Sequence, residues 1–375
     1  MSMDKFLIIT NVVHTKQNKK YFGYSPYVSE MNIWLKYTKQ TTIVAPLKNE
    51  VLSAIDLPYD CDNIIFRKVP AFDFKTLKNK FSSIFNLPII FWRVFVEIRK
   101  ADHIHLRCPG NIGLIGCIVQ IFFPSKVKTA KYAGNWDPKS KQPFTYKLQK
   151  YILGNTFLTK NMSVLVYGEW QNQSKNIKSF FTASYLESEK EIIQKTNFDS
   201  EIKFIFAGSL ATGKNPMYAV KLIEQLLLKG YNVKLDLFGD GLERDSIERY
   251  IKINKLNNSI ILKGNQNRET LKESYKKSHF VILPSKSEGW PKAIAEGMFW
   301  ECVPIGTYVS CVPFMLDFGN RGILLEMDLE KDINQILSII TKEDDFLNKS
   351  KLARIWSQKY TIEVFEKEIK DLILK

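Results

Sequence analysis

The chain has 375 residues, a hydrophobic content of 45% and a formal net charge of +15 at pH 7. Its length exceeds what one ordinary hydrophobic core supports and predicts two domains. No stretch approaches the ~20 consecutive apolar residues of a membrane-spanning helix. The basic balance favours an anionic partner, whether nucleic acid, an acidic membrane face or a phosphorylated substrate, although a generally basic proteome would produce it too.

The five cysteines are scattered, and none forms a C-x-x-C pair; they stand at positions 61, 108, 117, 302 and 311. An odd number at these spacings argues against a disulfide framework, so we expect reduced thiols in a cytosolic protein. The apolar run at residues 6–9 is short, and we interpret it as part of a first strand rather than a signal peptide.

The first half of the chain alternates predicted strands and helices, which is typical of a doubly wound α/β domain. A strand is predicted first, followed by a polar loop over residues 11–26 that contains Gly23. The other strands are short apolar runs, and the helices show apolar residues at helical spacing. Strands are predicted over residues 6–10, 41–45, 64–69, 102–107, 127–133 and 163–167, and helices over residues 27–37, 114–123 and 143–154.

Residues 77–100 form an aromatic and apolar segment with basic residues at both ends. Such a segment can lie on an anionic membrane surface. A helix packed on the sheet and kinked at Pro88 explains the same pattern, and we favour it because aromatic helices are usually part of a core. Both descriptions hold together if one face is buried and the basic ends are exposed.

Two strand-end loops of the first half carry polar side chains. His105 and Arg107 close one strand, and Asn135 and Asp137 follow another. Because the carboxyl ends of parallel strands meet at one edge of a sheet, these groups are expected along the same edge.

The second half restarts the pattern after a polar linker that we place near residues 187–200. Its last predicted helix has one apolar stripe formed by Ile362, Phe365, Ile369 and Leu372. Strands are predicted over residues 203–207, 233–238, 260–262, 280–283 and 303–306, and helices over residues 217–229, 243–254, 270–277, 292–300 and 360–375.

Residues 280–298 are predicted to form a buried strand, a polar loop and a helix. Pro291 suits the first helical position, where a missing N–H costs nothing. The helix would begin at the carboxyl end of a strand, and its free N–H groups favour an anion such as phosphate. Glu288 and Glu296 bracket this helix start. Carboxylates beside a phosphate site are costly unless they hold something, and sugar hydroxyls are natural candidates.

Three strand-to-loop junctions of the second half are expected at one sheet edge, at residues 208–214, 264–266 and 285–291. Together they supply the Lys214 cation, two backbone-rich turns, a helix N-terminus and two carboxylates. Each part alone is more often a solvated surface feature. The combination predicts a site for a nucleoside diphosphate joined to a sugar.

At these residues the sequence resembles the retaining, nucleotide-sugar-dependent glycosyltransferases of family four. The matching motifs are Gly208-Ser-Leu with Lys214, Gly239-Asp-Gly-Leu-Glu-Arg244, Leu283-Pro-Ser, Glu288-x7-Glu296 and Val303-Pro-Ile-Gly-Thr307. The likeness is specific over residues 200–325 and loose over residues 1–185. It implies the GT-B fold, in which two Rossmann-like α/β domains face each other across a cleft. We expect an acceptor domain over residues 1–190, a donor domain over residues 200–355 and a C-terminal helix, residues 356–375, that crosses back to the first domain.

The resemblance also implies roles for the residues of the donor site. Glu288 would contact the donor sugar near the reacting carbon, Glu296 the ribose hydroxyls and Lys214 the diphosphate. The loop after residue 262 would meet the base, and Gly23 would let the first loop approach the diphosphate. The donor-binding set is Gly23, Gly208, Ser209, Lys214, Gly264, Asn265, Gln266, Glu288, Gly289, Trp290, Pro291, Lys292, Ala293 and Glu296.

The sequence departs from the family at three places. Ser209 stands where an Arg is frequent, so more of the diphosphate charge would fall on Lys214. The family His expected in residues 134–136 is absent, so Asn135 would substitute for it or the role would move. A family His-x-His motif matches His105 and Arg107, with Arg replacing the second His; Arg107 could instead meet an anionic acceptor. For His103 and His105, a structural role in the strand fits equally well. The catalytic set is therefore Glu288, Lys214, Asn135 and Arg107.

The implied reaction transfers a hexose-type sugar, with retention, from a UDP- or GDP-sugar to a glycan or lipid-linked acceptor. No metal or other cofactor and no nucleic acid are expected. The expected setting is surface-polysaccharide assembly (capsule or lipopolysaccharide) in a bacterial cytoplasm, at the inner face of the membrane. A non-hydrolysing nucleotide-sugar epimerase is one alternative, although the carboxylates it would need in its first domain are not evident. A non-catalytic nucleotide-sugar-binding or membrane-binding protein is another.

Overall fold

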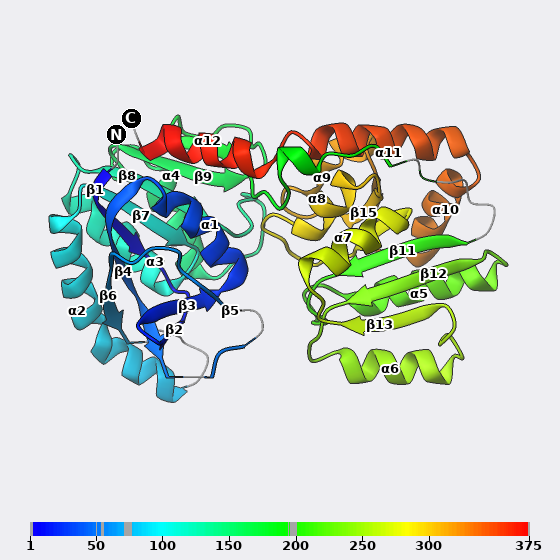
Figure 1. The fold of residues 1–375 in the computed structure, drawn as a ribbon, viewed down its shortest axis with the longest axis horizontal. Coiled ribbons are helices and arrows are strands. Elements are labelled where there is room, and N and C mark those ends of the chain that lie inside the picture. The colour runs from blue at the N-terminus through cyan, green and yellow to red at the C-terminus, as the bar shows by residue number, and fades with distance from the viewer. Residues whose placement is uncertain are drawn as a thin grey trace. The chain divides into compact units, whose positions relative to one another are not determined.

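The computed structural model describes residues 3–49, 51–53, 56–70, 77–193, 195 and 201–373, with only the backbone described for residues 77–85. Contacts divide the chain into two units, Met1–Phe181 with Val364–Lys375 and Thr182–Glu363 (Figure 1). The domain boundaries expected near residues 190–200 and 355 stay predictions, and residues 194 and 196–200 lie outside the described part of the chain.

The first unit contains a 10-stranded sheet in the order β10-β9-β8-β7-β1-β4-β2-β3-β5, with β6 paired to β4. Its strands are β1 (Met3–Ile9), β2 (His14–Gln17), β3 (Lys20–Tyr24), β4 (Thr38–Lys48), β5 (Asp56–Pro58), β6 (Ile64–Val69), β7 (His103–Cys108), β8 (Val127–Tyr132), β9 (Met162–Tyr167) and β10 (Ile177–Phe180). The chain moves outward from β1 toward β4 and β6, then returns to β7 and moves the other way. This reversal places the switch point of the sheet between β1 and β7.

The helices of the first unit are α1 (Ser25–Leu35), α2 (Leu77–Lys100), α3 (Asn111–Val119), α4 (Phe144–Gly154) and the single turn η1 (Gln120–Phe122). The C-terminal helix α12 (Ile362–Ile373) packs with this unit. Its Phe365 lies against Phe180 and Phe181, and Glu366 accepts hydrogen bonds from Lys36 and Tyr37 at 2.8 and 2.9 Å.

The loop predicted over residues 11–26 is instead largely a β-hairpin, formed by β2 and β3. Its turn residues Asn18 and Lys19 have φ values of 48° and 65°. Both central residues of a type I′ turn need positive φ, which Asn-Gly normally signals. Here Lys19 takes the place of that glycine, so the sequence lacked the usual hairpin signal.

Helix α2 packs on the sheet, as expected. Ile90, Val94 and Ile98 belong to the hydrophobic core of the unit, while Trp92 on the opposite face is 67% exposed. Among the described residues, no helix combines the length and hydrophobicity needed to cross a membrane.

The second unit contains a 6-stranded parallel sheet in the order β13-β12-β11-β14-β15-β16. The strands are β11 (Ile202–Ala207), β12 (Val233–Phe238), β13 (Ile260–Gly264), β14 (Phe280–Leu283), β15 (Val303–Thr307) and β16 (Ile323–Leu325). The helices are α5 (Pro216–Leu228), α6 (Arg244–Ile253), α7 (Arg268–Lys277), α8 (Lys292–Phe299), α9 (Val312–Met315), α10 (Leu329–Ile340) and α11 (Glu343–Ser357), with single turns η2 (Glu187–Glu189) and η3 (Asp317–Gly319).

The strand order of this unit determines where its helices lie. The chain runs from β11 to β13 in one direction and from β14 to β16 in the other. Because parallel crossovers are right-handed, α5 and α6 fall on one face, and α7 and α8 fall on the other. Contacts between α5 and α10 and between α8 and α11 then complete the two outer layers. The predicted doubly wound class is therefore confirmed in this unit.

A buried ion-pair cluster ties α1 to two strands of the first unit. Glu30 of α1 meets Arg107 of β7 at 2.5 Å and Lys131 of β8 at 2.9 Å. Burial disfavours the ionised carboxyl, but the two cations outweigh this effect and lower the pKa of Glu30 to about 2. The ionised Glu30 therefore stabilises the fold above its ordinary pKa of about 4.5, and the gain is lost as pH falls toward about 2.

We expect Glu30→Gln to lower the free energy of unfolding by about 3–5 kcal/mol, because it leaves two buried cations without their anion. Glu366→Gln, which removes an exposed pair with Lys36, is the control and should cost no more than about 1 kcal/mol. Urea unfolding between pH 7 and pH 3 measures both. Equal effects of the two substitutions, or an acid-induced loss that is unchanged in Glu30→Gln, would contradict this account.

Candidate functional site

The switch point of the second sheet lies between β11 and β14. These neighbouring strands pair in parallel, with Phe204 opposite Phe280, and the chain leaves them in opposite directions across the sheet. Such a point opens a crevice beyond the carboxyl ends of the strands, where α/β folds bind ligands. The loops that border it are residues 208–215 and 284–291.

One ion pair joins these two loops. Lys214 Nζ lies 2.6 Å from Glu288 Oε1, and the side chains are 29% and 5% exposed respectively. The loops also meet through the Lys286 N–H, which donates to the Gly213 carbonyl at 2.9 Å. The carboxylate is thus buried between the two loops, while part of the ammonium group faces solvent. Both residues were predicted to belong to the site. Their direct contact was not predicted, because they lie far apart in the sequence.

The loop that carries Glu288 and Gly289 is held by contacts from β15 and from the residue that precedes α9. Thr307 Oγ1 donates to the Ser285 carbonyl, and the Cys311 thiol donates to the Gly289 carbonyl at 3.0 Å. Burial, together with the Glu288 carboxylate, raises the pKa of Cys311, so this thiol stays protonated beside the site. These contacts hold the loop in one conformation before any ligand arrives.

Helix α8 begins directly after this loop. Pro291 occupies the N-cap position, one residue earlier than expected, and no side chain caps the helix. The first N–H groups of a helix, here those of Lys292 and Ala293, have no acceptor within it and carry a partial positive charge. Trp290 is buried and stacks on Trp356 with ring centroids 5.9 Å apart. The uncapped helix start therefore offers donors to an anion.

Glu296 lies one to two turns into α8 and is held by two hydroxyl groups. Ser184 Oγ donates to its Oε1 at 2.6 Å, and Tyr275 donates to its Oε2 at 3.4 Å. Burial and this carboxylate raise the pKa of Tyr275 well above its ordinary value, so the phenol remains a donor. The carboxylate is thus arranged to accept hydrogen bonds from hydroxyl groups.

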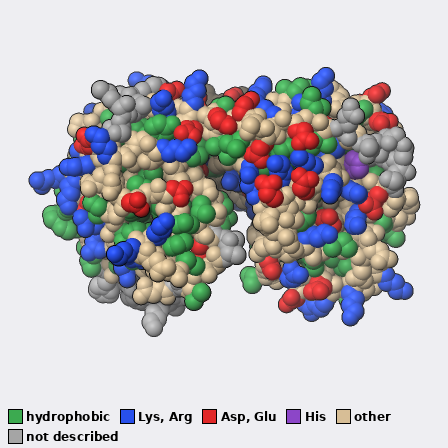
Figure 2. Space-filling view, viewed as in Figure 1, with side chains coloured by type: hydrophobic (Ala, Val, Ile, Leu, Met, Phe, Trp, Pro, Cys, Tyr) green, Lys and Arg blue, Asp and Glu red, His purple; other side chains and the backbone are tan. Residues whose placement is uncertain are grey.

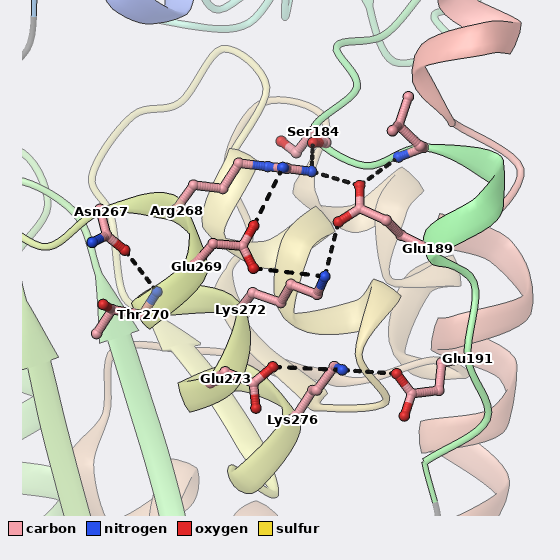
Figure 3. Close-up of polar contacts among 11 residues, drawn as sticks. Ser184, Glu189, Glu191, Asn267, Arg268, Glu269, Thr270, Lys272, Glu273 and Lys276 are labelled. Atoms are coloured by element: carbon pink, nitrogen blue, oxygen red, sulfur yellow. Dashed lines mark hydrogen bonds and ion pairs between the residues drawn. The ribbon is translucent and has the colours of Figure 1, made fainter.

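Ser184 is positioned by a charged network between α7 and residues 184–191 (Figure 3). Arg268 donates to the Ser184 carbonyl at 2.9 Å and to Glu189 at 2.6 Å. Lys272 meets Glu189 at 3.0 Å, and Lys276 meets Glu191 at 2.7 Å. Partial burial opposes the charged form of Glu189, but hydrogen bonds from the Leu186 N–H, Lys272 and Arg268 outweigh it and lower its pKa. This segment is therefore fastened to α7 beside Glu296.

Three glycine-bearing turns close the same edge of the sheet. The Gly239 N–H donates to the Gly264 carbonyl at 2.8 Å. Gly239 has a φ of +130°, and a Cβ there would lie 1.9 Å from the Gly208 carbonyl oxygen. Only glycine fits such a position. The exposed residues Ser209, Asn265 and Gln266 lie on these turns, so the predicted second-unit site residues share one sheet edge.

The remaining predicted site residues lie in the first unit. Gly23 is buried in β3, where a Cβ would lie 3.3 Å from Val28 and 3.4 Å from His14; packing within the unit already favours glycine there. Asn135 accepts a hydrogen bond from the Asp137 N–H at 2.9 Å. Arg107 is engaged by Glu30 as described above, which the sequence did not indicate. The part of each in binding or catalysis stays a prediction.

The two histidines of β7 are core residues of the first unit. His103 and His105 are fully buried, and each lies 2.9 Å from Thr129 Oγ1. Burial lowers the pKa of His105 well below its ordinary value, so its ring is neutral at physiological pH. The structural interpretation of these residues therefore accounts for their contacts.

Several residues of the site were not found from the sequence. Ser184, Tyr275, Arg268 and Cys311 contact site residues from distant positions, and none belongs to a motif. Within the described residues, no three His, Cys, Asp or Glu side chains are grouped as metal ligands would be. Metal independence of the reaction nevertheless stays a prediction.

Comparison with known proteins adds independent findings. Residues 188–359 match the family Glycosyl transferases group 1. Protein CapJ of Staphylococcus aureus is 28% identical over 74% of this chain and 75% of its own length. The poly(glycerol-phosphate) alpha-glucosyltransferase of Bacillus subtilis is 26% identical over 42% of this chain, which spans 24% of that protein. The crystal structure of Anabaena HepE in complex with UDP and glucose superimposes with a TM-score of 0.68 over 100% of both chains, at 13% identity.

These comparisons agree with the two α/β units and their parallel strands described above. The solved structure supports the fold, and the predicted GT-B class of two Rossmann-like units is confirmed. The family match covers almost the whole of the second unit, including both loops of the switch point.

We expect Gly239→Ala to destabilise the second unit by at least about 1–3 kcal/mol, because the new Cβ collides with a backbone carbonyl at a strained φ. Gly213→Ala is the matched control: a Cβ there meets nothing within 4 Å, and its stability should change by less than about 1 kcal/mol. Urea unfolding monitored by tryptophan fluorescence compares the two. If Gly239→Ala is as stable as the control, the described turn is incorrect.

Proposed function

We propose that this chain, whose residues 188–359 match the group 1 glycosyltransferase family, transfers a hexose-type sugar from a UDP- or GDP-sugar to a glycan or lipid-linked acceptor with retention of configuration. The observation that carries the proposal is the Lys214–Glu288 pair at the switch point, 2.6 Å apart, beside the uncapped start of α8. A cation, a helix start and a carboxylate at one crevice match a diphosphate joined to a sugar.

The diphosphate is the ligand part that fits the positive groups. Lys214 would turn its exposed ammonium toward the phosphates, and the N–H groups of Lys292 and Ala293 would donate to phosphate oxygens. As the bond between the anomeric carbon and the phosphate oxygen breaks, its electron pair stays on the diphosphate. These groups stabilise that developing charge, and they supply the role that a metal ion has in other transferases.

The two carboxylates fit the hydroxyl-bearing parts of the donor. Once a phosphate draws Lys214 away, Glu288 becomes an acceptor for sugar hydroxyls near the reacting carbon. Glu296 already accepts from the Ser184 hydroxyl at 2.6 Å, and ribose hydroxyls would take that place.

Retention follows if the acceptor hydroxyl attacks from the side that the diphosphate leaves. The new bond joins the acceptor oxygen to the anomeric carbon through a short-lived oxocarbenium-like state, and the hydroxyl proton passes to the departing phosphate oxygen. Asn135 and Arg107 are the first-unit candidates for this reaction. The name of the Bacillus relative, a poly(glycerol-phosphate) alpha-glucosyltransferase, supports a hexose as the transferred sugar and a polymer as its acceptor.

We expect Glu288→Ala to reduce sugar transfer by about 10²–10³-fold while the fold stays intact. Lys214→Ala should weaken nucleotide binding and transfer together, because it removes the cation that faces the phosphates. Glu326→Gln, which removes an exposed pair with Lys331, is the control and should be fully active. The measurement is release of UDP or GDP from a panel of sugar donors, with and without an acceptor.

The same assay separates the alternatives. Nucleotide release that continues unchanged in Glu288→Ala would show that the site is assigned incorrectly. Conversion of the sugar without transfer would favour an epimerase. Nucleotide binding in the wild type without turnover of any donor would favour a binding protein. Addition of EDTA should leave the rate unchanged, and a loss of activity that Mg²⁺ or Mn²⁺ restores would contradict the metal-independent proposal.

We also propose that the first unit contacts an anionic membrane through α2. Lys and Arg side chains gather along the edge that α2 forms, with hydrophobic groups between them (Figure 2). A groove of about 670 Å³ between β6 and α2 is lined by apolar residues such as Ile89 and Trp92 and by cations such as Arg93 and Lys100. Apolar groups that enter the interface between cationic ones are typical of peripheral membrane binding.

Trp92→Ala should lower binding to phosphatidylglycerol-containing vesicles by about tenfold, since it removes the largest exposed apolar side chain among the described side chains of α2. Phe318→Ala, at an aromatic residue of the second unit that is 69% exposed, should bind as the wild type does. Sedimentation with vesicles at low and high salt measures both. Failure of the wild type to sediment at low salt would contradict membrane contact.

A further inference from the structure

A second pocket lies entirely within the first unit, between α4 and the loops that follow β8 and β9. Its volume is about 500 Å³, within the range of pockets that bind small ligands. Both loops leave the carboxyl ends of paired parallel strands, which is the edge where α/β sheets bind ligands. Its lining includes Trp136 and Ser140 from the first loop, Lys147, Lys150 and Tyr151 from α4, and Gln173 from the second loop.

The helix α4 contributes an exposed aromatic face. Tyr151 is 64% exposed and Phe144 is 76% exposed, so neither ring is packed in the core. Residues 144, 147 and 151 lie on one side of a helix, so Lys147 stands between the two rings. A pyranose ring presents flat C–H faces and hydroxyl edges, and a rigid, amphipathic tyrosine suits such a surface.

Polar groups of the pocket are arranged beside these rings. Trp136 Nε1 donates to Gln173 Oε1 at 3.0 Å, so the donor end of the Gln173 amide is what this side chain can offer a ligand. Ser140 Oγ donates to the Asp137 carbonyl at 2.6 Å, and this hydrogen bond stabilises the turn within the first loop. A pocket organised in advance spends little ordering entropy on binding.

The pocket is also positively charged. None of the residues that line it is an acid. Lys150 Nζ donates to the Asp137 carbonyl at 3.0 Å and lies 5.7 Å from the Trp136 ring centroid. Burial lowers the pKa of Lys150 to about 8 against the opposing effect of the nearby Asp137 carboxylate, which still leaves most of the ammonium charged at neutral pH. With Lys147 beside it, the pocket presents two cations from one helix, a combination that attracts an anion.

We infer that this pocket is a subsite for an acidic glycan, in which Tyr151 stacks on a sugar ring and Lys147 and Lys150 meet its carboxylate. The first loop also carries Asn135, a predicted catalytic residue that directly precedes Trp136, so a glycan in this pocket lies next to that residue. The subsite therefore binds part of the acceptor, a conclusion that rests on the proposed transferase function. Its specificity is for an anionic acceptor chain rather than a neutral one.

The test is a calorimetric titration of the full chain with oligogalacturonate and, separately, with the neutral maltohexaose. The wild type should bind the acidic oligosaccharide more tightly, and the preference should shrink at high salt. Tyr151→Ala and Lys147→Ala should each weaken binding of the acidic oligosaccharide by roughly tenfold. Phe157→Ala and Lys160→Ala, at exposed positions that do not line the pocket, are matched controls and should bind normally.

Donor hydrolysis without acceptor separates this inference from the proposed function, because Tyr151 and Lys147 take no part in the donor site. Hydrolysis of the donor should be unchanged in both variants. Transfer to an acidic acceptor should fall because the KM for that acceptor rises. Absence of binding by the wild type, equal affinity for the neutral oligosaccharide, or normal binding by Tyr151→Ala would overturn the subsite while leaving the transferase proposal intact. If binding falls in the variants but no donor is ever turned over, the pocket binds glycans and the transferase proposal fails.

Discussion

The ion pair between Lys214 and Glu288 is the contact on which the second unit's edge depends. It joins the loops of two neighbouring strands at the point where the chain reverses its direction across the sheet. A carboxylate held in a crevice is unfavourable without a counter-charge, and Lys214 provides it. The pair therefore places two neutralising charges where the two loops meet. A donor with negative phosphates and neutral hydroxyls can divide the pair, because the phosphates attract the lysine and the hydroxyls satisfy the carboxylate.

Other contacts fix the remaining loops at the carboxyl edge of the second sheet. Hydrogen bonds from Thr307 and Cys311 fix the loop of Glu288, and the crowded turn at Gly239 keeps the neighbouring loops close to the sheet. The Glu296 carboxylate also has partners, but these are the hydroxyl groups of Ser184 and Tyr275 rather than a cation. Since Ser184 belongs to the segment that Arg268 fastens to α7, a ribose that displaces its hydroxyl would also act on this segment. On the proposed function, donor binding would therefore change the position of residues 184–191.

Local patterns in the sequence were sufficient to predict most of the second unit. The strands β11 to β15 and the helices α5 to α8 were predicted within a few residues, because each is a short apolar run or an amphipathic repeat between glycine or proline signals. The β2–β3 hairpin was missed because Lys19 adopts positive φ without the usual glycine. Partners such as Ser184 for Glu296 or Glu30 for Arg107 were missed because they are separated by 112 and 77 residues. Such contacts depend on the tertiary fold and leave no local pattern.

The central claim is that the donor binds at the carboxyl edge of the second sheet, across the β11–β14 switch point. Hydrogen–deuterium exchange with and without the nucleoside diphosphate that most raises the melting temperature tests it most directly. The account predicts protection in residues 208–215, 264–266 and 285–296, with a smaller effect at residues 184–191. Protection confined to the first unit, or to the opposite edge of the second sheet, would contradict it.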